Sequence, residues 1–262
     1  MKKIWIVTAA ALMLWGCAEP PVQAEEETEA QTETAETEVY EPVYACRTIN
    51  YYDYEKPVPE SEPIEDVYFT DVLMGGDSRM GSLYLYSDLG AKGAEIHYVT
   101  SLSLWRIYDA YMATADAPLY DLMISTTRHN IYLLIGINEI RGADFEAWKS
   151  ELSSIVQELK QAKPDGNIYL ILAYHPRYLS DITDEQLAAR VEEENQKMRE
   201  IAKENSIYFI DPDEALDDET GVLREDLTWD GLHLNTEGSQ LFADYIASHV
   251  VREERYVKEI CE

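Results

Sequence analysis

Cysteine is scarce in this chain, which has 3 Cys in 262 residues. That number is too small for a disulfide scaffold, which needs several bridges in a short chain. No Cys or His cluster has the spacing that zinc ligands usually show. The sequence therefore excludes a disulfide-rich module and gives no pattern typical of a zinc finger.

Basic residues are also few, with 21 Lys and Arg against 51 Asp and Glu and a formal net charge of -30. A chain this acidic repels phosphate backbones, so a nucleic-acid partner is excluded. The same negative net charge disfavours docking on anionic lipid through a basic patch. Hydrophobic residues still make up 46%, enough for one sizeable core, which excludes wholesale disorder.

The N-terminus has the pattern of an export signal. Lys2 and Lys3 precede an apolar run at residues 4–15, which is short for a transmembrane span. The run ends in Leu-Trp-Gly before Cys17 and resembles a bacterial lipobox. The resemblance implies that residues 1–16 are removed and that Cys17 is lipidated. The protein would then be anchored on the outer face of the bacterial cell membrane.

An ordinary signal peptide is the alternative, because Trp15 stands where a lipobox has a small residue. Cleavage would then fall near Ala18 or Ala24, Cys17 would be incidental and the protein would be secreted. Either way the export segment takes no part in the fold.

An acidic tether and an irregular arm are expected at residues 17–65. Glu, Thr, Ala, Gln and Pro dominate residues 18–41, where like charges extend the chain and nothing can bury a core. A Tyr-rich stretch at 43–63 follows as the arm. The folded domain is expected at residues 66–262.

Strands and helices alternate along the domain. Apolar β-rich runs occur at residues 67–74, 96–100, 131–135, 168–173 and 207–210. Apolar residues at helical spacing occur at 145–160 and 186–204, and a last helix is expected at 241–250, with Thr236 as a plausible N-cap. This alternation predicts a parallel sheet covered by helices on both faces, with ligands at the carboxyl ends of the strands.

Three segments could carry chemistry near that edge. Gly76-Asp77-Ser78-Arg79 follows the first strand, where a Ser at a helix N-terminus can act as a nucleophile or only as a cap. Gly136-Ile137-Asn138-Glu139 follows the third strand, where the Asn amide can donate to an oxyanion or only form a turn.

The third segment is Asp230-Gly231-Leu232-His233, before the last helix. A carboxylate three residues ahead of a His can reach the imidazole in a turn and fix its tautomer. The other His residues lack this spacing and are interpreted as structural or surface residues: His97, His129, His175 and His249.

Together the three segments resemble the blocks of the SGNH hydrolase superfamily, also called GDSL esterases or lipases. Gly76-Asp77-Ser78 is similar to its first block, Gly136-x-Asn138 to its third and Asp230-x-x-His233 to its fifth. The resemblance covers about residues 66–250. It implies the flavodoxin-like α/β/α sandwich with a five-stranded parallel sheet.

The resemblance also implies roles for these residues. Ser78 would be the nucleophile, His233 the general base and acid, and Asp230 the residue that orients His233. The oxyanion hole would combine the backbone N–H of Ser78, the Asn138 side chain and the backbone N–H of Ser101, which stands where the second block has Gly. Glu139 replaces the family's usual Asp at a mostly structural, hydrogen-bonding position, so a modest effect is expected. This chemistry needs no metal and no organic cofactor.

A serine esterase or deacetylase acting on acyl esters, such as O-acetyl groups of a surface or extracellular glycan, is the favoured function. Its partners would be an acylated small molecule or glycan and, through Cys17, the membrane. An O-acyltransferase of the same fold is one alternative. A non-catalytic binding lipoprotein on a degraded SGNH scaffold is another alternative. It is suggested by Ser101 and Glu139, which both depart from the residues usual in the family.

The last expectation concerns the two remaining cysteines. If Cys17 carries lipid, Cys46 and Cys261 can form a disulfide in an oxidising exterior and tie the arm to the C-terminal tail. Two free thiols are the alternative.

Overall fold

The computed structural model of the chain describes residues 46–261. They belong to one compact unit that begins at Cys46. The predicted signal peptide, the lipidated Cys17 and the acidic tether up to residue 45 lie outside the described residues. Within the described range, no helix is both long enough and apolar enough to cross a membrane.

Five parallel strands form the central sheet. They are β2 (Val72–Gly76), β3 (Glu95–Tyr98), β4 (Asn130–Leu134), β5 (Asn167–Ile171) and β6 (Tyr208–Ile210). Their order across the sheet is β3-β2-β4-β5-β6, and every neighbouring pair is parallel. The predicted five-stranded parallel sheet is thus confirmed.

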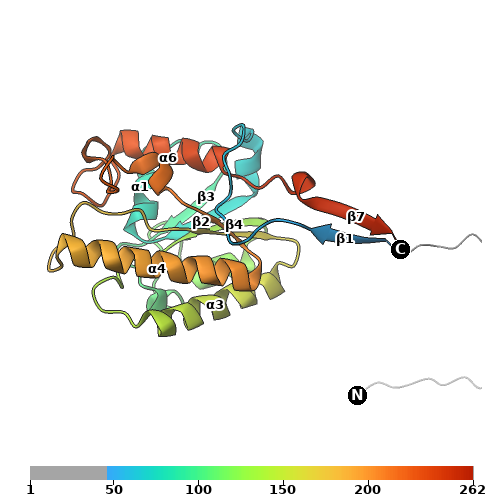
Figure 1. Cartoon of the computed structure of the whole chain (residues 1–262), viewed down its shortest axis with the longest axis horizontal. Coiled ribbons are helices and arrows are strands. Elements are labelled where there is room, and N and C mark those ends of the chain that lie inside the picture. Colours follow the sequence, from blue (N-terminus) through green and yellow to red (C-terminus); the bar gives the residue numbers. More distant parts are fainter. Residues whose placement is uncertain (1–45, 262) are drawn as a thin grey trace, which may run out of the picture. The chain divides into compact units, whose positions relative to one another are not determined.

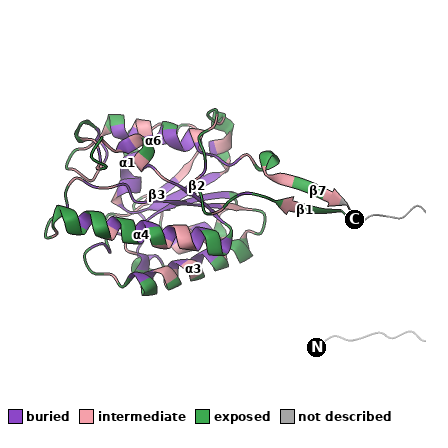
Figure 2. Ribbon diagram, viewed as in Figure 1, coloured by how far each residue is buried: buried purple, intermediate pink, exposed green. Residues whose placement is uncertain are grey.

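Helices cover both faces of this sheet. They are α1 (Ser78–Tyr86), α2 (Leu119–Ser125), α3 (Phe145–Ala162), α4 (Asp184–Asn205), α5 (Asp213–Leu216) and α6 (Thr236–Ser248). Figure 1 shows α3 and α4 on one face and α1 and α6 on the other. Each face has its own apolar core, and buried residues fill both sides of the strands (Figure 2). The three-layer α/β/α sandwich is therefore confirmed.

The apolar patterns explain the two long helices. In α3 the buried residues recur every three or four positions, from Phe145 and Trp148 to Leu159. In α4 the side chains of Thr183 and Gln186 form a capping box that fixes the first turn. These helices extend one to two residues beyond the predicted ranges.

The first predicted strand is shorter than expected. Residues 66–71 form a 3₁₀ helix, and the strand begins only at Val72. The Thr70 hydroxyl donates to the carbonyl oxygen of Val67 at 2.7 Å and closes the turn, although both residue types favour strands. At the last helix the cap is Asn235 rather than Thr236, because the Asn235 side chain accepts the backbone N–H of Gly238.

The arm contains a strand that the sequence analysis did not predict. Strand β1 (Cys46–Asn50) pairs antiparallel with β7 (Val257–Cys261) in a two-stranded sheet apart from the central one. The rest of the arm packs on the domain: Tyr52 and Val58 are buried, and Val58 donates its N–H to the carbonyl oxygen of Phe209 on β6.

The ends of the described chain meet in this small sheet. Cys46 is disulfide-bonded, and Cys261 is the residue opposite it in the β1–β7 register. Opposed antiparallel residues have Cα atoms about 4.5–5.5 Å apart, which suits a disulfide. Cys261 as the bonding partner stays our prediction.

The strand order determines where a site can form. β2 and β4 are neighbours, whereas β3 lies on the other side of β2, so the chain reverses its direction of winding between β2 and β4. In such sheets ligands bind at this switch point, outside the carboxyl ends of the strands. The segments that carry Ser78 and Asn138 follow β2 and β4, so both emerge at this point.

Candidate active site

Ser78 stands at the junction between a buried strand and a helix. β2 ends at Gly76, Asp77 follows, and Ser78 is the first residue of α1. The Asp77 carboxylate caps the helix by accepting the backbone N–H of Arg79 at 2.9 Å. Because Asp77 is the cap, the Ser78 hydroxyl is available for another partner.

The glycine before this junction is explained by strand packing. A Cβ atom on Gly76 would lie 2.1 Å from the carbonyl oxygen of Leu134 on β4. The β2 and β4 backbones approach each other so closely here that any side chain would block them.

His233 lies between Ser78 and Asp230. Its Nε2 is 2.8 Å from the Oγ atom of Ser78, and its Nδ1 is 2.7 Å from Oδ2 of Asp230. The other oxygen of Asp230 accepts the backbone N–H groups of Leu232 and His233 at 3.0 and 2.8 Å. The fold thus brings together three predicted residues from segments far apart in the sequence.

Hydrogen bonding keeps Asp230 ionised. Partial burial alone would raise its pKa, but hydrogen bonds from the backbone and side chain of His233 and from the backbone of Leu232 give a pKa below the usual value. An ionised Asp230 favours a proton on Nδ1 of His233, which leaves Nε2 to accept the Ser78 proton.

A buried ion pair within the Ser78 segment contacts a side chain that bonds the His233 loop. Arg79 donates to both carboxylate oxygens of Asp77, at 3.1 and 2.8 Å, and both side chains are buried. The guanidinium of Arg79 also lies 5.7 Å from the ring centre of Tyr174, whose hydroxyl donates to the carbonyl oxygen of Leu232 at 2.7 Å. These contacts hold the Ser78 junction and the His233 loop in one arrangement.

Ser101 adopts the backbone conformation that usually requires glycine. Its φ is 59°, in the left-handed region, and the residue is exposed. The loop is held by two bonds from the Asn138 turn: the Asn138 side-chain amide donates to the carbonyl oxygen of Leu102 at 2.9 Å, and Glu139 accepts the backbone N–H of Leu104. A Ser can therefore occupy the position of the second-block Gly.

One N–H of the Asn138 amide is therefore used within the protein. An Asn amide has two such donors, and the second forms no hydrogen bond within residues 46–261, so it can meet an oxyanion. The Ser78 N–H is among the first groups of α1 that have no acceptor inside a helix. The oxyanion roles of Ser78, Ser101 and Asn138 stay predictions. The geometry is compatible with them, because each residue keeps an N–H group that can donate to an oxyanion.

We predict that Ser101→Gly keeps or raises esterase activity, whereas Ser101→Val lowers kcat by 10-fold or more. Glycine adopts a positive φ without the steric cost of about 1–2 kcal/mol per residue that a Cβ atom brings, and a β-branched residue pays most. Steady-state hydrolysis of p-nitrophenyl acetate, with thermal unfolding as the folding control, tests this. Equal kcat values for the Gly and Val variants would show that this loop does not shape the site.

Glu139 has a larger role than the sequence indicated. We expected a modest structural effect from Glu in place of the family's Asp. Its carboxylate is buried and accepts the Leu104 N–H, so it joins the Ser101 loop to the Asn138 turn. Burial raises the pKa of Glu139 to about 7, against the lowering effect of that hydrogen bond.

The raised pKa of Glu139 predicts a pH effect on stability. Between the usual carboxyl pKa near 4.5 and the folded value near 7, the folded state binds the extra proton. The free energy of unfolding should therefore fall as pH rises through this window, by on the order of 2–3 kcal/mol. Denaturant unfolding of the wild type and of Glu139→Gln at pH 5 and pH 8 tests this, and a decline equally steep in both proteins would contradict it.

Glu194 is a second buried acid that the sequence analysis missed. It lies on α4, is fully buried, and its carboxylate oxygens have no hydrogen-bond partner among the described residues. Burial raises its pKa well above the usual range. A Cβ atom on Gly136, whose φ is 119°, would meet its carboxylate at 1.8 Å, so Gly136 is needed both for its conformation and for this contact. Helical periodicity alone gave no sign of this acid, because charged residues surround it in the sequence.

Comparison with known proteins agrees with this site. The sequence model of the GDSL-like lipase/acylhydrolase family matches residues 78–241, more than half of the chain. The chain belongs to this family. It is accordingly a carboxylic ester hydrolase of the SGNH type, which confirms the resemblance seen in the sequence. Among curated proteins, none matches the sequence.

Solved structures share the fold at low identity. A GDSL-like lipase from Parabacteroides merdae aligns with a TM-score of 0.53 and 15% identity, over 72% of this chain and 95% of that one. An acylhydrolase from Bacteroides fragilis aligns with a TM-score of 0.52 and 16% identity, over 72% of this chain and 88% of that one. A Streptococcus pneumonia protein described as a platelet activating factor aligns with a TM-score of 0.51 and 22% identity, over 66% of this chain and 80% of that one. At these identities the likeness shows the fold alone.

Proposed function

We propose that this family member is a serine esterase in which Ser78, His233 and Asp230 form the catalytic triad. Ser78 Oγ attacks the ester carbonyl carbon while His233 Nε2 takes the hydroxyl proton. The bond from that carbon to the alcohol oxygen then breaks, and Nε2 returns the proton to the departing alcohol. Asp230 holds the imidazole in place and stabilises its charged form.

Water completes the reaction. A water molecule attacks the acyl-enzyme carbon and gives a proton to His233, and that proton passes to Ser78 as the acid is released. The N–H groups of Ser78, Ser101 and Asn138 stabilise the oxyanion of each tetrahedral intermediate. The contacts on the two sides of His233 carry this proposal: the 2.8 Å contact with Ser78 Oγ is the path of the proton, and the 2.7 Å contact with Asp230 holds the ring in the orientation that this transfer needs.

The substrate we propose is an O-acetyl ester on a neutral glycan. Large aromatic side chains stand exposed beside the site: Trp229, 65% exposed, precedes Asp230, and Trp105 follows the Ser101 loop. Tyr178 is 60% exposed, and its backbone N lies 3.4 Å from where a Gly231 Cβ would be. Flat apolar faces with a polar edge suit the faces of sugar rings, and a neutral sugar escapes repulsion by the -30 charge.

Acetate release from acetylated xylan, compared with hydrolysis of p-nitrophenyl acetate, tests this substrate class. Trp229→Ala should lower kcat/KM on the polymer by about 10-fold and leave the small ester within twofold. Tyr51→Ala is the matched control, since Tyr51 is similarly exposed but belongs to the arm. Equal loss on both substrates, or acetyl transfer to an added sugar in place of acetate release, would contradict the proposal.

We also propose that the enzyme works outside the cell, held to the membrane by lipid on Cys17. The lipobox-like sequence before Cys17 and the acidic stretch after it support this location. Membrane fractions should contain the protein, and Cys17→Ser should deplete it from them. Recovery of the wild-type protein from the secreted fraction, cut beyond Cys17, would contradict the anchor.

A further inference from the structure

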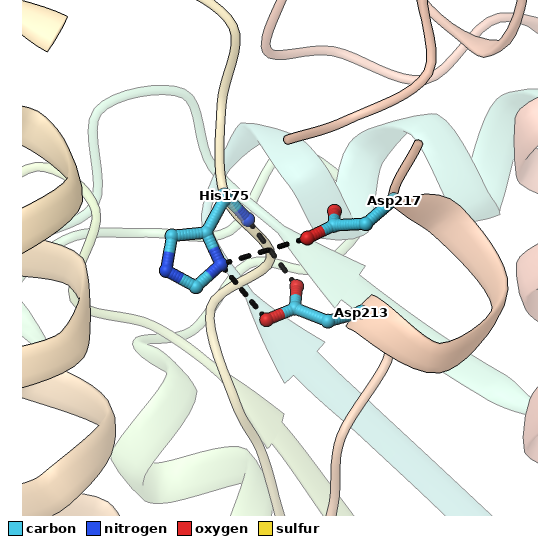
Figure 3. Close-up of side chains that lie close together, drawn as sticks. All are labelled: His175, Asp213 and Asp217. Atoms are coloured by element: carbon cyan, nitrogen blue, oxygen red, sulfur yellow. Dashed lines mark hydrogen bonds and ion pairs between the residues drawn. The ribbon is translucent and has the colours of Figure 1, made fainter. Parts of the chain in front are cut away.

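A second group of titratable side chains gathers where the segment after β5 meets α5, and it takes no part in the triad. His175 follows β5, Asp213 begins α5 and Asp217 is the cap at its end (Figure 3). His175 Nδ1 lies 2.8 Å from Oδ2 of Asp213 and 3.7 Å from Oδ2 of Asp217. Both carboxylates face the same ring nitrogen in Figure 3.

Asp217 lacks the partners that a buried carboxylate needs. Its side chain is only 10% exposed, and its Oδ1 is buried without a hydrogen-bond partner among residues 46–261. Its Oδ2 is too far from His175 for a hydrogen bond. A buried carboxylate without donors is costly, so this side chain points to a missing positive partner.

The cations nearby are engaged elsewhere. Arg177 binds Asp218 at 2.8 Å, and Arg199 lies 3.7 Å from Asp211. No Lys or Arg in the described part of the chain forms an ion pair with Asp213 or Asp217, so His175 is the one basic group that faces both. Two carboxylates and one imidazole leave a surplus of negative charge that a divalent cation would balance.

We propose that His175, Asp213 and Asp217 bind a divalent transition-metal ion, with Zn²⁺ as the best match. Imidazole nitrogen with carboxylate oxygen is a zinc donor set, whereas Ca²⁺ and Mg²⁺ prefer oxygen alone. The three ligand atoms lie within 4.8 Å of one another. Zinc bonds of about 2.0–2.2 Å place tetrahedral ligands about 3.4 Å apart, so small side-chain movements suffice. Binding releases the proton that Nδ1 shares with Asp213.

The fourth ligand of this ion is water. His175 also lines a cavity of about 260 Å³ together with Asp184 and Thr220, so one of the three ligands borders a space that water can enter. Three protein ligands with one open position are common for zinc. The ion takes no step in ester hydrolysis, because none of its three ligands forms a hydrogen bond or ion pair with Ser78, His233 or Asp230 among the described residues.

The position of the cluster gives the ion a structural role. The segment that carries His175 contacts the His233 loop twice: Arg177 donates its N–H to the carbonyl oxygen of Gly231 at 2.8 Å, and the Tyr174 hydroxyl bonds Leu232. The carbonyl oxygen of His175 accepts the N–H of Leu223 at 2.8 Å. An ion at His175 would join the His175 segment to α5 through Asp213 and Asp217. It would thereby stabilise the segment that contacts the His233 loop.

Zinc titration of the full chain, purified without an affinity tag and stripped with a chelator, tests the proposal. Calorimetry should show one saturable Zn²⁺ site, and the Tm should rise by about 5–10 °C at 100-fold excess over Kd. Esterase activity at 25 °C should change by less than twofold, so the result is independent of the proposed function. The absence of a one-to-one site would overturn the proposal.

Variants locate the site. Asp217→Asn and His175→Gln should abolish zinc binding and the Tm rise. His129→Gln is the matched control and should keep both zinc binding and the Tm rise. Like His175, His129 lies 2.8 Å from an aspartate, Asp71, but it forms no ion pair with a second carboxylate among the described residues. Unchanged binding in Asp217→Asn would overturn the proposal. If a variant fails to fold, the d–d spectrum of Co²⁺-loaded wild type decides: a tetrahedral spectrum with nitrogen ligation supports the site, and an octahedral aquo spectrum overturns it.

Discussion

Ser78→Ala is expected to lower kcat for p-nitrophenyl acetate by about 10⁶ while the Tm stays within a degree or two of the wild type. The hydroxyl that forms the acyl-enzyme is lost, and a triad nucleophile typically carries a factor of this size. The helix should tolerate the change, since Asp77 and not Ser78 caps α1. Steady-state kinetics and thermal unfolding measure the two effects.

Ser154→Ala, an exposed serine on α3, is the control for this substitution. It should be indistinguishable from the wild type in both measurements. Turnover of Ser78→Ala near the wild-type rate would end the proposed mechanism. A fall in activity accompanied by a large fall in Tm would assign the effect to folding instead.

His233→Ala should be about as damaging as Ser78→Ala, and the double variant should lose no further activity. The two side chains act as one unit through their 2.8 Å contact, so their losses do not add. Asp230→Asn should cost about 10⁴ in kcat, because an amide favours the wrong imidazole tautomer. Kinetics of the three variants with the same ester measure these losses.

His175→Ala is the control for the base. His175 also lies beside an aspartate at 2.8 Å, but within residues 46–261 its ring faces Asp213 and Asp217 and forms no hydrogen bond with Ser78. Its activity should stay within 10-fold of the wild type. Inactivation by His175→Ala with survival of His233→Ala would show that the base was wrongly assigned.

The central sheet could be predicted because its strands are buried on both faces. A short apolar run such as residues 131–135, rich in β-branched and aromatic residues and followed by Gly136, favours a buried strand over a helix. The order of the strands could not be read from the pattern. The structure supplied that order. The meeting of Ser78 with His233, which are 155 positions apart, was expected only from the resemblance.

The features that the sequence missed depend on contacts between distant segments. β1 has no apolar alternation, because it pairs only with β7 and both strands are mostly solvated. His175 and Asp213 are 38 positions apart, so no spacing rule connects them. The left-handed φ of Ser101 occurs in a loop that Asn138 and Glu139 bond at Leu102 and Leu104, and the sequence of the loop alone does not show these contacts.

Labelling with a fluorophosphonate probe, followed by peptide mass mapping, tests the central claim most directly. The probe phosphonylates a serine only where a base activates its hydroxyl and donors stabilise the oxyanion. We predict one adduct per chain, on the peptide that contains Ser78, and its loss in both Ser78→Ala and His233→Ala. An unlabelled wild-type protein, or an adduct on another serine, would contradict the assignment of Ser78 as the activated nucleophile.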